Sequence, residues 1–305
     1  MSAHVVELLL VPGVHLLDVA GPAQVFSAAA DLGAPYELRY LAMTASVPTA
    51  QGAALTALAP PWPTPEPVST VLIPGWKVGE GTASRRVDPE LLERIRSAAA
   101  LGGRIASVCA GAFALAAAGV LDGRRATTHH RVQDELAREF PAVQVVPDVL
   151  HVSDGDVHTS AGIASGIDLA LHLVSLDHGP AFAAQVARSL VVPARRNGAQ
   201  AQESPMLRYR DHLADLVHRA QDLIDSRYAE ALTLDDLAGE LAVSVRTLTR
   251  AFVDATGLTP TAYRQQIRMA QAGDLHSQGA SWAQAAVAVG FSDARTLRRL
   301  RERRS

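Results

Sequence analysis

The sequence predicts an α/β domain with a mostly parallel sheet, followed by an all-α domain, and three observations support this prediction. The chain has 305 residues, which exceeds one ordinary domain and suits two. Short apolar runs alternate with helical patterns over the first two thirds, which is typical of a parallel sheet covered by helices on both faces. After residue 192 the strand signal does not return, and the apolar spacing is helical.

The expected strands are short apolar runs, two of which end in Pro-Gly pairs that indicate turns. We expect strands over residues 5–11, 36–42, 71–73 and 104–108. We expect helices over residues 18–30, 88–101 and 110–118, and from Ile167 onward. Asp88 and Pro89 give the second of these helices an N-cap and a proline at its first position. The segment 48–67, rich in Pro, Ala and Thr, is expected to be a surface loop.

The domain boundary is expected where periodicity is lost, in a segment that begins at Pro193. We therefore predict an α/β domain over residues 1–192, a linker over 193–210 and an all-α domain over 211–305. Residues 211–228 carry apolar side chains at helical spacing and open the last domain.

Composition and charge limit the classes of function. Hydrophobic residues make up 48% and charged residues 19%, which excludes global disorder. The single cysteine, Cys109, excludes an internal disulfide and a multi-cysteine zinc site, and we expect no metal and no cofactor. No apolar run reaches a membrane span of about 18 residues and no signal segment opens the chain, so we expect a cytoplasmic protein. Residues 1–192 carry a net charge of −6 and residues 193–305 a net charge of +3, which indicates a polyanion partner or a solvated basic face.

The segment 234–252 carries a helix-turn-helix pattern. Thr233 and Ser244 are expected N-caps of its two helices, while Leu248 and Phe252 form the inner face of the second helix. The turn carries Ala242 where glycine is usual, so an ordinary helical hairpin is the alternative. The outer face of the second helix then presents three candidate DNA-binding residues, Arg246, Thr249 and Arg250.

A second copy of the pattern begins at Ser281, with Gly290 in its turn, and a long helix that includes Arg268 connects the copies. Two such units, with the motifs VSVRTLTRAF, GLTPTAYRQQIRMAQA and AVAVGFSDARTL, resemble the AraC/XylS family of DNA-binding domains. The resemblance implies that both recognition helices enter successive major grooves of double-stranded DNA. The second helix presents Arg295, Thr296, Arg298 and Arg299.

The second unit departs from the family pattern in two respects. Arg301 stands where the family has phenylalanine, and the chain ends at Ser305 without the family's closing helix. We therefore expect a truncated, loosely held second unit that contributes phosphate affinity more than base discrimination.

The α/β domain carries a candidate pocket. Cys109 lies at a sharp turn from strand to helix, where the helix N-terminus would favour a thiolate and so oxidation or modification. Asp18 ends a neighbouring strand. The motifs LLDVAGPAQVF, SVCAGAFALAAAGVLDGRRATTHH and HTSAGIASGIDLALHL resemble the DJ-1/PfpI superfamily, especially its GlxA-like branch fused to AraC-type domains. This resemblance implies a flavodoxin-like parallel sheet, a homodimer, and a pocket formed by Asp18, Cys109 and His129.

Each pocket residue has a simpler alternative. Cys109 could be a buried small hydrophobe, Asp18 a helix cap and His129 a structural histidine. The histidine that peptidase-like members place after the cysteine is Ala110 here, and isonitrile hydratases have threonine at that position. We assign no residue a confident catalytic role.

The leading interpretation is a bacterial transcription regulator that is not an enzyme. Its α/β domain would sense an unidentified small-molecule effector or the redox state, and its C-terminal domain would bind DNA. The alternative is a cysteine-dependent amidase or isonitrile-hydratase-like enzyme with a DNA-binding tail. A third hypothesis is a non-catalytic scaffold that binds DNA poorly.

Overall fold

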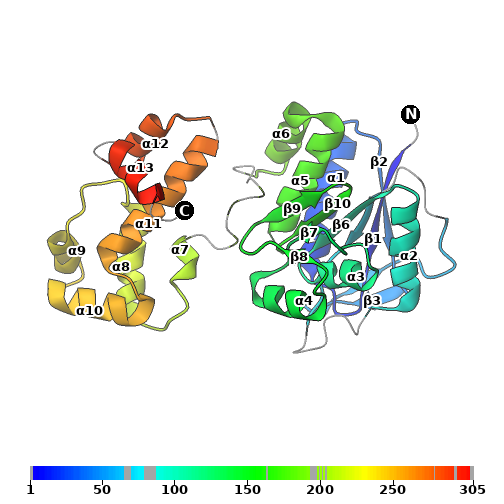
Figure 1. The fold of residues 1–305 in the computed structure, drawn as a ribbon, viewed down its shortest axis with the longest axis horizontal. Helices are drawn as coiled ribbons and strands as arrows, with labels where there is room; N and C mark the ends of the chain where they lie inside the picture. The colour runs from blue at the N-terminus through cyan, green and yellow to red at the C-terminus, as the bar shows by residue number, and fades with distance from the viewer. Residues whose placement is uncertain are drawn as a thin grey trace. The chain divides into compact units, whose positions relative to one another are not determined.

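A computed structural model describes residues 3–64, 70–78, 87–162, 164–192, 198, 200, 202, 205–277, 279–291 and 294–302. The chain divides into two units, Met1–Gln202 and Glu203–Ser305. Figure 1 shows a sheet with helices in the first unit and helices alone in the second. None of the helices in the described part of the chain is long and apolar enough to cross a membrane.

The first unit is built on a six-stranded sheet with the strand order β2-β1-β5-β6-β10-β9. Its strands are β1 (His4–Leu9), β2 (Tyr36–Leu41), β5 (Thr70–Ile73), β6 (Arg104–Val108), β9 (His151–Asp154) and β10 (Val157–Ser160). Every neighbouring pair is parallel except β9 with β10 at one edge. The prediction of a mostly parallel, flavodoxin-like sheet is confirmed.

Helices cover both faces of this sheet (Figure 1). In β1, Val6 and Leu8 pack with α1 (Leu16–Asp31), α5 (Ser165–His178) and α6 (Pro180–Ser189), whereas Leu9 packs with α2 (Pro89–Ala100) and α3 (Gly111–Ala117). Successive side chains of a strand point to opposite faces, so one apolar run serves two hydrophobic cores. The shorter elements of this unit are β7 (Arg125–Ala126), the 3₁₀ turn His130–Val132, α4 (Gln133–Glu139) and β8 (Gln144–Val145).

Two sequence-based expectations for the first unit are wrong. The expected loop over residues 48–67 overlaps a hairpin of β3 (Ser46–Pro48) and β4 (Ala54–Thr56), whose three-residue strands are too short for alternation to be visible. Helix α1 begins at Leu16, so Asp18 lies inside it, and the residue at the N-cap is His15. The alternative in which Asp18 caps a helix that starts at Val19 is therefore excluded.

The second unit contains seven helices within its described residues. They are α7 (Pro205–Arg208), α8 (Asp215–Ser226), α9 (Leu234–Glu240), α10 (Val245–Thr256), α11 (Pro260–Ser277), α12 (Trp282–Ala288) and α13 (Ala294–Glu302). Leu237, Leu248, Phe252 and Tyr263 belong to the core around α9 and α10. A second cluster, which includes Phe291 and Leu297, lies around α12 and α13. The predicted all-α domain with two helix-turn-helix units is confirmed.

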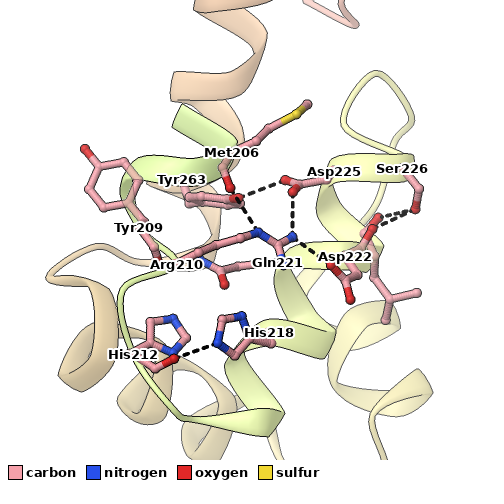
Figure 2. A network of polar contacts seen from close by, with 11 residues as sticks. Met206, Tyr209, Arg210, His212, His218, Gln221, Asp222, Asp225, Ser226 and Tyr263 are labelled. Carbon is pink, nitrogen blue, oxygen red and sulfur yellow. Dashed lines mark hydrogen bonds and ion pairs between the residues drawn. The ribbon is translucent and has the colours of Figure 1, made fainter. Parts of the chain in front are cut away.

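Parts of the segment expected to be a linker, 193–210, are attached to a folded unit. Residues 193–197 lie outside the described residues, but the Gly198 carbonyl accepts hydrogen bonds from the backbone N–H groups of Leu150 and His151 in the first unit. At its end, the Arg210 guanidinium donates to Asp222 at 2.7 Å and Asp225 at 2.8 Å on α8 (Figure 2). Tyr263 of α11 donates to the other oxygen of Asp225 at 2.9 Å. These bonds attach Arg210 to α8, and residues 205–210 belong to the second unit.

Candidate ligand pocket and nucleic-acid interface

Cys109 occupies the tight turn between β6 and α3. Its φ is +55°, in the left-handed region that a side chain makes unfavourable. The turn is held by the Cys109 N–H, which donates to the Ser160 carbonyl at 2.9 Å, and by the Thr128 hydroxyl, which donates to the Cys109 carbonyl at 2.7 Å. Strained residues that the surroundings hold in place are common at functional sites, so this turn is a candidate site.

Two glycines allow the backbone to approach Cys109 closely. A Cβ on Gly75 would lie 2.5 Å from Oδ2 of Asp18 and 2.6 Å from Cβ of Cys109. A Cβ on Gly162, whose φ is +121°, would lie 2.9 Å from the cysteine Sγ. The structure therefore brings Asp18 and Cys109 together, and it also packs Gly162 against the thiol.

The surroundings of Cys109 oppose ionisation of its thiol. Desolvation, followed by the Asp18 carboxylate, raises the pKa of Cys109 to about 12, against the opposing effect of the Ala110 N–H. The N-terminus of α3 does favour the thiolate through the Ala110 N–H, as expected, but burial and the neighbouring negative charge have the larger effect, so the expectation of an ionised thiol is wrong. Cys109 is 8% exposed, so it also behaves as the buried small residue considered above.

His129 lies beside this pair in a small cavity. The cavity has a volume of about 110 Å³ and is lined by His129, His130, Leu150, Ala161, Gly162, Ala164, Ser165 and Gln202. Desolvation, then the neighbouring His130 and Arg131, lower the pKa of His129 to about 4, so it is neutral at pH 7. Its Nδ1 accepts from the Arg131 N–H at 3.3 Å. Gly162 lines the cavity and also packs against Cys109, so the three predicted pocket residues, Asp18, Cys109 and His129, lie in one region.

Gln202 is a cavity residue that the sequence reasoning missed. It falls within the segment expected to be a linker, and no periodicity or motif marks it. Within the described residues, no group of three or more His, Cys, Asp or Glu side chains is placed to hold a metal ion.

The first helix-turn-helix unit has well-formed local signals. Thr233 and Asp236 form a reciprocal capping box at α9, and the Ser244 hydroxyl accepts from the Thr247 N–H at 3.1 Å at the start of α10. Ala242 has a φ of +55°, as the turn requires. Leu248 and Phe252 are fully buried. This leaves Arg246 and Arg250 exposed and Thr249 half-buried on the outer side of α10.

The second unit repeats this construction. Ser281 and Gln284 form a capping box at α12, and Gly290, with a φ of +84°, occupies the turn. Leu297 is 1% exposed, which directs Arg295, Arg298 and Arg299 of α13 to the surface, while Thr296 is half-buried. The side chain of Arg301 lies outside the described part of the chain.

Arg268 of α11 joins the two helix-turn-helix units. Its guanidinium donates to the carbonyls of Tyr228 at 2.5 Å, Glu230 at 2.8 Å and Gly290 at 2.8 Å. It also lies 5.7 Å from the centre of the Phe291 ring. A Cβ on Gly290 would clash with the Ala229 carbonyl. These contacts fix the turn of the second unit against the segment between α8 and α9.

Comparisons with known proteins agree with both units. Residues 4–176 match the DJ-1/PfpI family, and residues 237–304 match a helix-turn-helix domain. The HTH-type transcriptional regulator ArgR of Pseudomonas aeruginosa is 32% identical over 69% of this chain and 64% of its own length. The isonitrile hydratase of Pseudomonas putida is 37% identical over 55% of this chain and 69% of its own.

Solved structures show the same fold for the first unit. A THiJ/PfpI family protein from Pseudomonas syringae is 26% identical, with a TM-score of 0.56 over 64% of this chain and 78% of its own. An AraC family transcriptional regulator from Pseudomonas putida has a TM-score of 0.54 at 21% identity over 61% of this chain and 99% of its own. The chain covers 64% of the length of the regulator ArgR and 53% of the length of the regulator GbdR, both of Pseudomonas aeruginosa.

Proposed function

Because the chain belongs to the DJ-1/PfpI family and carries a helix-turn-helix domain, we propose that it is a transcription regulator that binds double-stranded DNA and senses a small molecule. The observation that carries the proposal is the outer face of α10, where the buried Leu248 and Phe252 leave Arg246 and Arg250 exposed. Arginines on a helix that enters the major groove make bidentate hydrogen bonds to guanine.

The DNA-binding surface comprises residues from both recognition helices: Arg246, Thr249, Arg250, Arg295, Thr296, Arg298 and Arg299. The net charge of +3 on residues 193–305 supports attraction to phosphates. A homodimer would present two such surfaces, and linking two modules raises affinity through effective concentration. The protein would then act in the cytoplasm, on the nucleoid.

Ligand sensing fits the pocket better than catalysis or redox sensing does. A cysteine nucleophile needs a thiolate or an adjacent base. Here burial and Asp18 raise the pKa of Cys109, which opposes a thiolate. The Nδ1 atom of His129 already accepts a hydrogen bond from the Arg131 N–H, so it is not free to act as a base. Oxidation also proceeds through the thiolate, so the same burial argues against a fast redox response.

We expect Arg246→Ala and Arg250→Ala each to weaken binding to specific DNA by about 1–3 kcal/mol, because each removes a base contact. Genomic fragments captured by the purified protein supply the operator, and mobility shifts measure its affinity. The matched control is Arg138→Ala, which removes an exposed arginine from α4 of the α/β unit. Unchanged operator affinity in both α10 variants would exclude this helix from base recognition.

An isonitrile-hydratase-like activity is the second candidate. Two observations favour it, namely the similarity to the hydratase and the contact between Asp18 and Cys109. Turnover of an isonitrile by the purified protein, abolished in Cys109→Ser, would establish the enzyme. No turnover above that of Cys109→Ser would exclude it for the isonitrile tested.

A further inference from the structure

We propose that one wall of the cavity is a recognition site for a primary amide, and that the protein's own Gln202 occupies it until a small amide ligand displaces it. This inference rests on the ligand-sensing part of the proposed function, and it adds the chemical class of the ligand and a link to the DNA-binding unit.

The carboxamide of Gln202 has a complete set of partners. Its Nε2 donates to the Thr128 carbonyl at 2.9 Å and to the Val149 carbonyl at 3.1 Å, while its Oε1 accepts from the His130 N–H at 2.8 Å. All three partners are backbone groups, whose roles as donor or acceptor are fixed, so the orientation of the amide is determined. The site therefore presents two acceptors and one donor to a planar NH₂–C=O group.

The site is built before any ligand arrives. Gln133, which is 8% exposed, also donates to the Thr128 carbonyl, at 3.1 Å. The Thr128 side chain is fully buried, and its hydroxyl donates to the Cys109 carbonyl at 2.7 Å. One residue thus contacts both Gln202 and the strained turn. Such preorganisation lowers the cost of binding a small ligand.

These partners define the class of ligand. A primary amide or a urea supplies two N–H donors and one acceptor oxygen, whereas an amidinium has no acceptor for the His130 N–H and a carboxylate has no donors. The adjoining cavity of about 110 Å³ is lined partly by Leu150, Ala161 and Ala164, so a short apolar substituent fits beside the amide. A buried amide group gains its hydrogen bonds only where partners of this kind are present.

The position of Gln202 in the chain gives its displacement a consequence. Gln202 is the last residue of the first unit, and its backbone N–H donates to Asp148 at 3.0 Å. Only Glu203 and Ser204 separate it from α7, which belongs to the second unit. Release of Gln202 frees the last residue of the first unit, so a bound ligand alters how the chain that leads into the second unit is attached.

The test uses the full chain, with propionamide as the probe and N,N-dimethylpropionamide as a control that lacks both N–H donors. Calorimetry measures the Kd of each compound for the wild type and for Gln202→Ala. If Gln202 occupies the site in about nine molecules of ten, its removal lowers the Kd for propionamide about tenfold. The matched variant Gln185→Ala, at an exposed position on α6, is expected to bind like the wild type.

Hydrogen exchange gives an independent readout. The amide of His130 loses its acceptor in Gln202→Ala, so its exchange rate is expected to rise and to fall again when propionamide is added. Equal Kd values for the two compounds, no binding by folded Gln202→Ala, or an unchanged His130 exchange rate would each overturn the proposal. These measurements involve no DNA, so their failure is distinguishable from failure of the mobility shifts that test the regulator itself.

Discussion

At the scale of single residues, desolvation and the Asp18 carboxylate together raise the pKa of Cys109 to about 12. The thiol is then almost entirely protonated at pH 7, and only the thiolate reacts quickly. We expect iodoacetamide to alkylate the native thiol far more slowly than the thiol of the denatured chain. In Asp18→Asn the negative charge is removed, so the pKa of Cys109 falls and alkylation accelerates about tenfold for each unit.

Mass spectrometry after timed quenching measures both alkylation rates, and the urea-denatured forms of the two proteins serve as controls that should react equally. Native wild-type protein that is alkylated at pH 7 as fast as its denatured form would show that the fold neither raises the pKa of the thiol nor shields it from the reagent.

His158 offers a prediction about pH. It is 3% exposed, and the Ser153 hydroxyl lies 2.8 Å from its Nδ1. Burial, then Arg104, His172 and His151, lower its pKa to about 4, although Asp177 acts in the opposite direction. Because the pKa of this histidine is lower in the folded protein than in the unfolded chain, the unfolded chain binds more protons than the folded protein between these two pKa values. The free energy of unfolding therefore falls as the pH falls from 6.5 toward 4.

For His158 alone this loss is about 2 kcal/mol between pH 7 and pH 5. Urea unfolding of the α/β unit, followed by tryptophan fluorescence at several pH values, measures it. In His158→Gln the decline between pH 7 and pH 5 should be smaller by that amount. An equally steep decline in the variant would assign the pH dependence to other groups.

At the scale of helices and strands, Arg268 holds the turn of the second helix-turn-helix unit against the segment between α8 and α9. We expect Arg268→Lys to weaken operator binding even though it keeps the charge. A single ammonium group cannot reach the carbonyls of Tyr228, Glu230 and Gly290 together, as the planar guanidinium does. Faster hydrogen exchange in α12 should accompany the loss, and Arg219→Lys, at an exposed site on α8, should change neither quantity. Wild-type exchange and affinity in Arg268→Lys would show that these bonds do not orient the unit.

Local signals explain which elements could be predicted from the sequence. The caps at Thr233, Ser244 and Ser281 involve residues three positions apart, so they can be read along the chain. The site of Gln202 cannot be recognised along the chain in this way. Its partner Thr128 lies 74 residues earlier and contributes only a backbone carbonyl, which every residue has. The raised pKa of Cys109 was missed for a related reason, since burial is a property of the folded unit. Helix α7, with four residues, is too short to show periodicity.

At the scale of the whole molecule, the two helix-turn-helix units are unequal in their cores. The first buries Leu237, Leu248, Phe252 and Tyr263 among others. Among the residues whose side chains the structure describes, the second unit has the smaller cluster, and half of its members are alanines: Ala272, Ala285, Ala286, Val289, Phe291 and Leu297. Because stabilisation scales with the apolar area buried, we expect the second recognition helix to be held less firmly than the first.

From this difference we expect α10 to discriminate between sequences and α13 mainly to neutralise phosphates. Bidentate contacts to bases need side chains held in place, whereas mobile arginines can still pair with phosphates. Replacing Arg295, Arg298 and Arg299 by alanine should therefore lower affinity about equally for operator and scrambled DNA. It should also flatten the dependence of log K on log salt by roughly 0.9 unit for each phosphate that the protein no longer neutralises.

A salt titration of both DNAs, with Arg246→Ala as the comparison that loses operator binding selectively, separates the two roles. If the α13 variant instead loses operator binding alone and keeps the wild-type salt slope, its helix reads bases, and a small core is then no obstacle to base recognition.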